Sequence, residues 1–290
     1  MAPVEIEPGI GAGVLSPGAA RRRAQAGASH LPVPAPDLAD LEAVGRWRAA
    51  VHAAWGEQLP HEPPHRRTSV AGVPCLEAGP APGASGRAPA VVYAHGGGYV
   101  LGSAAVAAPI TARLARHGRV VSVDYRLAPE HPFPAGLDDV TAVAAELARR
   151  GPVALVGDSA GGGIALAAAL RLAARGSAPV AVVLLCPHLR HDATEPFSRA
   201  YLGPCPADDP GASPLLAALG GLPPLLVQVA AHEALAPQAV ALARRARRAG
   251  VAVSLDVWDG LWHTWHYHLD VPEAGLALDE AASFVLAHAG

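Results

Sequence analysis

A serine in a strand-to-helix turn is the first residue of this sequence that could carry out chemistry. Ser159 is the central residue of GDSAG at 157–161, which follows an apolar strand pattern at 153–156 and opens a helical pattern at 160–175. The glycines allow a turn sharp enough to expose the hydroxyl at the carboxyl edge of a sheet. The helix that follows presents backbone N–H groups to negative charge developing nearby. This context predicts a nucleophilic serine rather than an ordinary glycine-rich turn.

A run of glycines earlier in the chain is suited to binding an oxyanion. HGGG at 95–98 directly follows another apolar strand pattern. Amide N–H groups can approach an oxygen there because no side chain stands in the way. We therefore expect Gly96 and Gly97, together with the N–H of Ala160, to form an oxyanion hole beside Ser159. A phosphate-binding loop is the alternative, but the run lacks the Lys and Ser/Thr of a P-loop and the full G-x-G-x-x-G spacing.

The expected general base is His263. It lies between a strand pattern at 251–257 and a helical pattern at 273–288, where a chain order of serine before histidine places the base. His266 and His268 are close in sequence, and the three imidazoles could bind a metal only if the loop curled around it. Neither an H-E-x-x-H pattern nor a compact Cys/His cluster is present in the sequence. We therefore expect a base here, with no metal and no cofactor.

The elements that must position these residues follow a regular alternation. Strands are expected at 91–94, 120–123, 153–156, 180–185, 225–229 and 251–257, and helices at 104–117, 136–150, 160–175, 235–249 and 273–288. Strict alternation of strand and helix predicts a parallel sheet with helices on both faces. Strands buried on both faces are continuously apolar, as these are. The predicted fold class is therefore α/β.

The domain organisation is expected to be simple. Residues 1–36 are rich in Gly, Pro and Ala and are interpreted as an irregular leader. From residue 37 onward we expect a single domain, 37–290. Apolar residues spaced three and four apart predict an amphipathic helix at about 37–56, which must cover another part of the protein.

Composition excludes several classes of protein. Of 290 residues, 51% are hydrophobic and 16% charged, which indicates a globular chain rather than a disordered one. The formal net charge of −3 does not favour a nucleic-acid partner. No apolar run reaches the roughly 18 residues of a membrane span, so no membrane association is expected. Three widely spaced cysteines without a C-x-x-C pair indicate a reducing, cytoplasmic environment. The sequence allows a homodimer.

Five longer segments carry a resemblance to a known family. They are HGGGYVLGS at 95–103, VDYRLAPEHPFPAGLDD at 123–139, GDSAGG at 157–162, SPLLAALGGLPPLLVQVA at 213–230 and DGLWH at 259–263. In this order they resemble the hormone-sensitive-lipase-like carboxylesterases, the HGGG or bacterial family IV branch of the α/β-hydrolase superfamily. The resemblance covers about residues 37–290.

The resemblance implies a fold and an activity. The fold is an α/β-hydrolase with a mostly parallel central sheet, helices on both faces and a reduced helical cap. The reaction is hydrolysis of carboxylic esters, with Ser159 as nucleophile and His263 as general base and then acid. A small-molecule ester or acyl compound is the implied partner. The substrate pocket is expected to be lined by His95, Gly98, Tyr99, Asp158, His188 and Trp262.

The chain departs from the family at the acid of the triad. The family carries an aspartate in a G-S-D-E-like turn after the strand at 225–229, and here AAHE at 230–233 places His232 in that position. Glu233 is one substitute, and Asp192, which follows an earlier strand, is a second. The remaining alternative is a true loss of the acid. Replacing this carboxylate by an amide in a serine protease lowers kcat by about 10⁴, so the acid bears directly on activity.

A second departure concerns the cap. The segment at about 187–212, which in the family supplies part of the cover over the active site, is short in this chain. His188 and Arg190 replace the Trp and Asp that the family usually carries there. We therefore expect a smaller second cap segment and a more open pocket.

Three functions are compatible with these residues. The leading hypothesis is a serine hydrolase that cleaves esters through a Ser159 acyl-enzyme. The alternatives are a repurposed biosynthetic enzyme performing acyl transfer, lactone chemistry or elimination, and a small-molecule binder without turnover. The nucleophile, the glycine run and His263 together argue against the binder, because binding alone needs no nucleophile.

Overall fold

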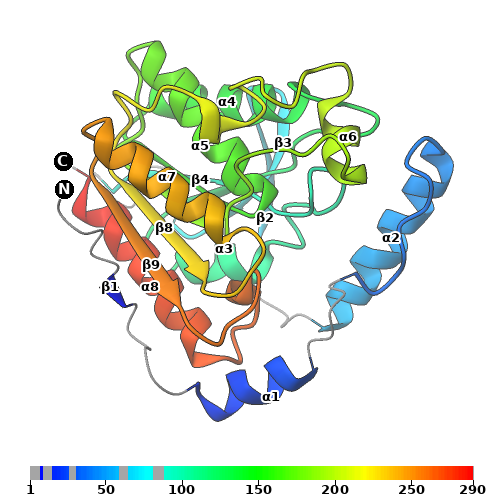
Figure 1. The fold of residues 1–290 in the computed structure, drawn as a ribbon. Helices are drawn as coiled ribbons and strands as arrows, with labels where there is room; N and C mark the ends of the chain where they lie inside the picture. Colours follow the sequence, from blue (N-terminus) through cyan, green and yellow to red (C-terminus); the bar gives the residue numbers. More distant parts are fainter. Residues whose placement is uncertain (1–6, 9–14, 26–30, 59–64, 81–87, 290) are drawn as a thin grey trace.

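In the part of the chain that the structure describes, a nine-stranded sheet runs through the protein (Figure 1). The computed structural model describes residues 7–8, 15–25, 31–58, 65–80 and 88–289. The strands, in the order they occupy in the sheet, are β1 (Glu7–Pro8), β9 (Val253–Trp258), β8 (Leu225–Ala230), β7 (Val182–Leu185), β6 (Val153–Asp158), β4 (Ala90–Ala94), β5 (Val120–Val123), β3 (Val73–Ala78) and β2 (Arg66–Val70). The pairs β2–β3 and β3–β5 are antiparallel and all others are parallel. The predicted mostly parallel α/β sheet is confirmed, and all six predicted strands are present.

The antiparallel β2–β3 hairpin was not predicted. It is closed by Ala71 and Gly72, whose φ angles are 52° and 81°. Positive φ at both central residues is typical of a type I′ turn, which Asn-Gly or Asp-Gly normally signals. An Ala-Gly pair in a stretch broken by Pro and Gly does not give that signal, so the hairpin is not apparent in the sequence.

The helices cover both faces of the sheet. They are α1 (Pro17–Gln25), α2 (Leu41–Gln58), α3 (Ala108–Leu114), α4 (Ala135–Ala148), α5 (Ala160–Ala174), α6 (Pro196–Leu202), α7 (Ala236–Arg248) and α8 (Pro272–Ala287), with short 3-10 helices η1 (Pro214–Leu216) and η2 (Trp265–Tyr267). Helices α4, α5 and α7 share a core with one face, and α3 and α8 share a second core with the other. Successive residues of β4 contribute to the two cores in turn, as alternation along a strand requires.

Two further helices lie near the N-terminus. Helix α2 occupies most of the predicted 37–56 helix, and its Trp47 and Val51 are buried. Helix α1 lies inside the segment that the sequence indicated only as an irregular leader. Its start is marked by Ser16, whose hydroxyl accepts the N–H of Ala19 at 3.2 Å, a capping signal. No helix in the described part of the chain combines the length and apolar character needed to cross a membrane.

Helix α5 approaches the sheet closely enough to require glycine. A Cβ atom on Gly161 would overlap the carbonyl oxygen of Ala94 in β4. This close approach sets the start of α5, and with it the turn that carries Ser159.

We predict that Gly161→Ala lowers the free energy of unfolding by about 1–3 kcal/mol, because the added methyl group overpacks a rigid backbone contact. Urea denaturation measures the change. Gly151→Ala is the matched control, because a Cβ there meets nothing within 4 Å, and it should change stability by less than about 0.5 kcal/mol. Equal stabilities for the two variants would contradict the packing argument.

Candidate active site

The turn between β6 and α5 holds Ser159 in a strained conformation. Its φ and ψ are 50° and −117°, outside the regions that L-residues normally occupy. The turn is tight enough that a Cβ on Gly157 would overlap the carbonyl oxygen of Gly161. The N–H of Ser159 donates to the carbonyl of Leu185 at 2.8 Å, which ties the turn to β7. The serine side chain therefore stands at the carboxyl edge of the sheet, as the motif predicted.

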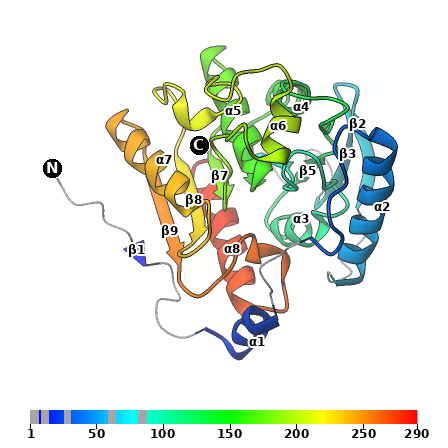
Figure 2. The same ribbon diagram turned by 45° about the vertical axis from the view of Figure 1, so that its right-hand side comes forward.

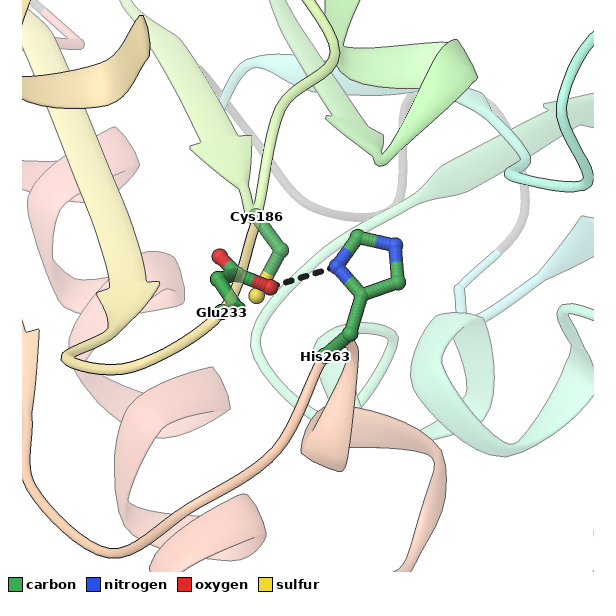
Figure 3. Close-up of side chains that lie close together, drawn as sticks. All are labelled: Cys186, Glu233 and His263. Carbon is green, nitrogen blue, oxygen red and sulfur yellow. Dashed lines mark hydrogen bonds and ion pairs between the residues drawn. The ribbon is translucent and has the colours of Figure 1, made fainter. Parts of the chain in front are cut away.

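His263 connects Ser159 to a carboxylate. Its Nε2 lies 2.9 Å from Ser159 Oγ. Its Nδ1 lies 2.5 Å from Glu233 Oε2, the contact drawn in Figure 3. The imidazole is about one quarter exposed, whereas the Glu233 side chain is 3% exposed. Three residues from three different loops thus form one hydrogen-bonded chain from the surface into the interior.

The structure decides between the candidate carboxylates. His232, in the position of the family's aspartate, points into solvent, and its Nε2 lies 3.4 Å from Asp259 Oδ1. Asp192 is exposed and accepts hydrogen bonds from the N–H and hydroxyl of Thr194. Because Glu233 occupies His263 Nδ1, the predicted alternatives of Asp192 and of a lost acid are both wrong.

A buried thiol lies behind this pair. Cys186 Sγ accepts the N–H of Thr264 at 3.4 Å and lies beside the Glu233 carboxylate (Figure 3). Burial, and then the neighbouring Glu233 charge, raise the pKa of Cys186 well above its ordinary value. The thiol is therefore protonated at neutral pH and packs as a small neutral group.

The arrangement of possible metal ligands differs from the histidine trio considered from the sequence. Within the described residues, the group with metal-ligand spacing consists of Cys186, Glu233 and His263. Two features explain why these three residues lie close together: Glu233 is hydrogen-bonded to His263, and the neutral Cys186 thiol packs beside them. His266 lies elsewhere, buried with its Nε2 3.2 Å from Gln228 Oε1.

The glycine run differs from the prediction in one donor. The N–H of Gly96 donates to Asp158 Oδ1 at 2.8 Å, so it is not available to a substrate oxygen, and this part of the predicted oxyanion hole is wrong. Gly97 and Gly98 are partly exposed, with φ of 121° and 60°. Within the described residues, the N–H groups of these two glycines donate to no protein acceptor. Of the two predicted glycine donors, Gly97 therefore keeps an N–H that is not bound to a described protein acceptor, and Gly98 shares this property.

Asp158 is an interior anchor, not the pocket residue that was predicted. Its carboxylate accepts the hydroxyls of Tyr93 at 2.6 Å and Tyr267 at 3.1 Å, besides the N–H of Gly96. Burial raises the pKa of Asp158, and the three donors oppose that shift. The sequence provided no signal for the two tyrosines, because their distance from Asp158 is set by strands and loops far apart in the chain.

Two other predicted pocket residues are also buried. His95 stacks on Tyr125 and has its Nδ1 2.8 Å from the carbonyl oxygen of Gly96. Tyr99 donates its hydroxyl to the carbonyl of His188 at 3.1 Å and stacks on Tyr201. Both rings support the loops from behind and cannot form the pocket wall.

The remaining predicted wall residues, Gly98, His188 and Trp262, are partly exposed. Trp262 packs against a third core cluster, which includes Trp258 and Trp265. The ring centroids of Trp262 and His268 are 5.5 Å apart. A residue that the sequence analysis missed lies against Gly98: a Cβ there would come within 2.5 Å of the ring of Phe197 in α6. Phe197 also meets Trp47 of α2, with 5.9 Å between ring centroids.

The chain is similar to known hydrolases along most of its length. A family model described as alpha/beta hydrolase fold matches residues 91–267. An acetyl-hydrolase of Streptomyces hygroscopicus is 35% identical over 67% of this chain and 74% of its own. The putative acetyl-hydrolase LipR of Mycobacterium tuberculosis is 30% identical, over 80% of this chain and 83% of its own. A crystal structure of an esterase from the bacterial hormone-sensitive lipase family superposes with a TM-score of 0.80, at 34% identity, over 96% of this chain and the whole of that one.

Buried neutral histidines around the site make stability depend on pH. Burial lowers the pKa of His95 to about 4 and that of His266 to about 3, from an ordinary value of 6.5. At pH values between the lowered pKa of each histidine and its ordinary pKa of 6.5, the unfolded chain binds more protons than the folded one. Their contribution to stability is therefore complete above pH 6.5 and is lost as the pH falls.

We predict that the free energy of unfolding decreases by roughly 1.4 kcal/mol per pH unit for each of these histidines between pH 6.5 and about 4. Urea denaturation at several pH values measures the slope. His266→Gln keeps a hydrogen-bond partner for Gln228 and should reduce the slope. An unchanged slope in that variant would show that His266 does not contribute.

Proposed function

The chain belongs to the alpha/beta hydrolase fold family, in its hormone-sensitive-lipase-like branch, and on that premise we propose that it is a serine esterase. It cleaves carboxylic esters through an acyl-enzyme on Ser159. The observation that carries the proposal is the continuous hydrogen-bonded chain from Ser159 Oγ through His263 to Glu233. A serine made nucleophilic by a base, with the base oriented by a third group, is the arrangement that acyl transfer requires.

The first step is attack on the ester carbonyl carbon. His263 carries its proton on Nδ1, donates it in a hydrogen bond to Glu233, and accepts the Ser159 proton on Nε2 as Oγ forms the new bond. The carbonyl π electrons move to the oxygen, giving a tetrahedral oxyanion. The Glu233 carboxylate stabilises the imidazolium ion that is formed at the same time.

The negatively charged oxygen of this intermediate accepts hydrogen bonds from backbone N–H groups near Ser159. We assign this role to Gly97, Gly98 and Ala160, because the N–H of Gly96 is held by Asp158. Donors held rigidly in place before the reaction stabilise developing charge most effectively. The contact between Asp158 and Gly96 provides that rigidity by fixing the start of the glycine run.

Collapse of the intermediate completes acylation. The carbonyl re-forms, the bond to the leaving oxygen breaks, and His263 Nε2 gives its proton to the departing alcohol. Water then enters, loses a proton to His263 and attacks the acyl carbon, and a second collapse returns the proton to Ser159 and releases the carboxylic acid. In successive steps His263 Nε2 accepts a proton and then donates it, while Nδ1 stays hydrogen-bonded to Glu233.

The substrate we propose is a small ester with a short acyl group. Phe197 lies directly against Gly98 beside the proposed oxyanion hole and is backed by Trp47, which limits the room for a long chain. The names of the acetyl-hydrolase relatives are consistent with this. The contact between Glu233 and His263 supplies the orienting carboxylate that ester hydrolysis uses, which favours the esterase over the repurposed-enzyme alternative.

We predict that Glu233→Gln lowers kcat for p-nitrophenyl acetate by about 10² to 10⁴, because the amide cannot stabilise the imidazolium and favours the wrong tautomer. The change should appear in kcat more than in KM. His232→Asp and Asp192→Asn are the matched controls, since both side chains point into solvent, and both should stay within about twofold of the wild type, as surface changes generally do. Full activity in Glu233→Gln would remove Glu233 from the mechanism.

We also predict that a fluorophosphonate probe forms one covalent adduct, on Ser159. Peptide mass spectrometry locates the adduct, and Ser159→Ala should abolish both labelling and ester turnover. Labelling without turnover on any p-nitrophenyl ester would favour a repurposed enzyme, and the absence of both would favour a binder.

A further inference from the structure

We infer that helix α1 is a positioning element for His263, acting through the turn that begins the histidine loop. The inference rests on the proposed function for its catalytic consequence and on contacts of the described residues for its geometry. Helix α1 lies outside the 91–267 segment that matches the family model. Contacts of α1 and of Ser16, which directly precedes it, link α8 and the neighbouring Asp270 to Gly260, in the loop that carries the base.

The far end of this loop is held by the protein interior. The N–H of Thr264 donates to Cys186 Sγ at 3.4 Å, and Tyr267 donates to Asp158 at 3.1 Å. Trp265, between them, is completely buried. These contacts fix the backbone after His263, and the turn at 259–260 before it is held by a separate set of contacts.

Helix α1 and its flanking residue hold the near end. Arg23 Nη1 donates to the carbonyl oxygen of Gly260 at 3.2 Å. The side chain of Leu15 packs on the same glycine, where a Cβ would lie 2.9 Å from it. The φ of 73° at Gly260 also favours glycine. The turn thus combines a polar and an apolar contact with the N-terminal segment.

The helix is itself anchored firmly on α8. The N–H and hydroxyl of Ser16 donate to the two carboxylate oxygens of Glu273, at 2.7 and 2.8 Å. Arg22 pairs at 2.8 Å with Asp270, which lies two residues before the start of α8. Ala19 is completely buried in the third core cluster, which also contains Leu261 of the histidine loop. Figures 1 and 2 both show α1 lying beside α8.

Restraint at both ends of the loop determines the position of His263 Nε2. His263 lies between the two restrained ends, so a shift of the 259–260 turn changes the 2.9 Å separation from Ser159 Oγ. Misplacement of a reacting group by about 1 Å can cost on the order of 10²-fold in rate. A partial release through one contact should cost less than that.

The test compares Arg23→Ala with Arg21→Ala. Arg21 lies on the same helix and is exposed, so its removal controls for loss of positive charge and for helix propensity. Arg23→Ala should lower kcat about 10-fold with little change in KM or melting temperature, and Arg21→Ala should leave all three unchanged. Arg23→Lys should restore part of kcat, because an ammonium can still donate to the single Gly260 carbonyl.

A second readout does not depend on ester turnover. The Nδ1 proton of His263, hydrogen-bonded to Glu233, should give a downfield proton resonance by NMR, and Arg23→Ala should shift or broaden it while Arg21→Ala does not. A changed resonance in a protein that hydrolyses no ester would support the positioning role and overturn the proposed function. If Arg23→Ala matches Arg21→Ala in both kcat and the resonance, α1 does not position the base.

Discussion

A single buried carboxylate, that of Asp158, joins the three segments on which the site depends. It precedes Ser159 in the chain, accepts the N–H of Gly96 at the start of the glycine run, and accepts the hydroxyl of Tyr267 after the histidine loop. Hydrogen bonds to a charged group contribute about 1.5–3 kcal/mol each, and a buried charge is tolerated only when such partners are present. The same buried carboxylate is therefore tied to the segments that carry the nucleophile, the proposed oxyanion donors and the base.

Several residues in the loops around this anchor have strained backbone conformations. Tyr99, Ser159, Cys186 and Thr264 all have positive φ without being glycine. Each such residue costs on the order of 1–3 kcal/mol and persists only where the surroundings enforce it. Here the enforcement comes from a sheet that is buried on both faces, so that the ends of β4, β6, β7 and β9 are held at fixed spacings.

Glu233 shows how the sheet and its loops accommodate a change of sequence at the position of the family's aspartate. Glu233 lies one position beyond the family's aspartate and has one more methylene group, and the turn presents it to His263 while His232 faces Asp259 in solvent. The protonated Cys186 thiol fills the space behind the carboxylate without adding a second charge. At the start of the loop that carries His263, Arg23 of α1 donates to the carbonyl oxygen of Gly260.

The sequence by itself determined the alternation of strands and helices, the Ser159 turn and the choice of His263, because each depends on local pattern or on order along the chain. It could not determine which carboxylate meets His263, since the direction of a turn side chain depends on the loops packed around it. Whether Gly96 is a free donor depends on an acceptor 62 residues away, and the burial of His95 and Tyr99 depends on Tyr125 and Tyr201 from other segments. The docking of α1 depends on Glu273, Asp270 and Gly260. Only the tertiary structure decided these features, because each is a contact between residues that the fold alone brings together.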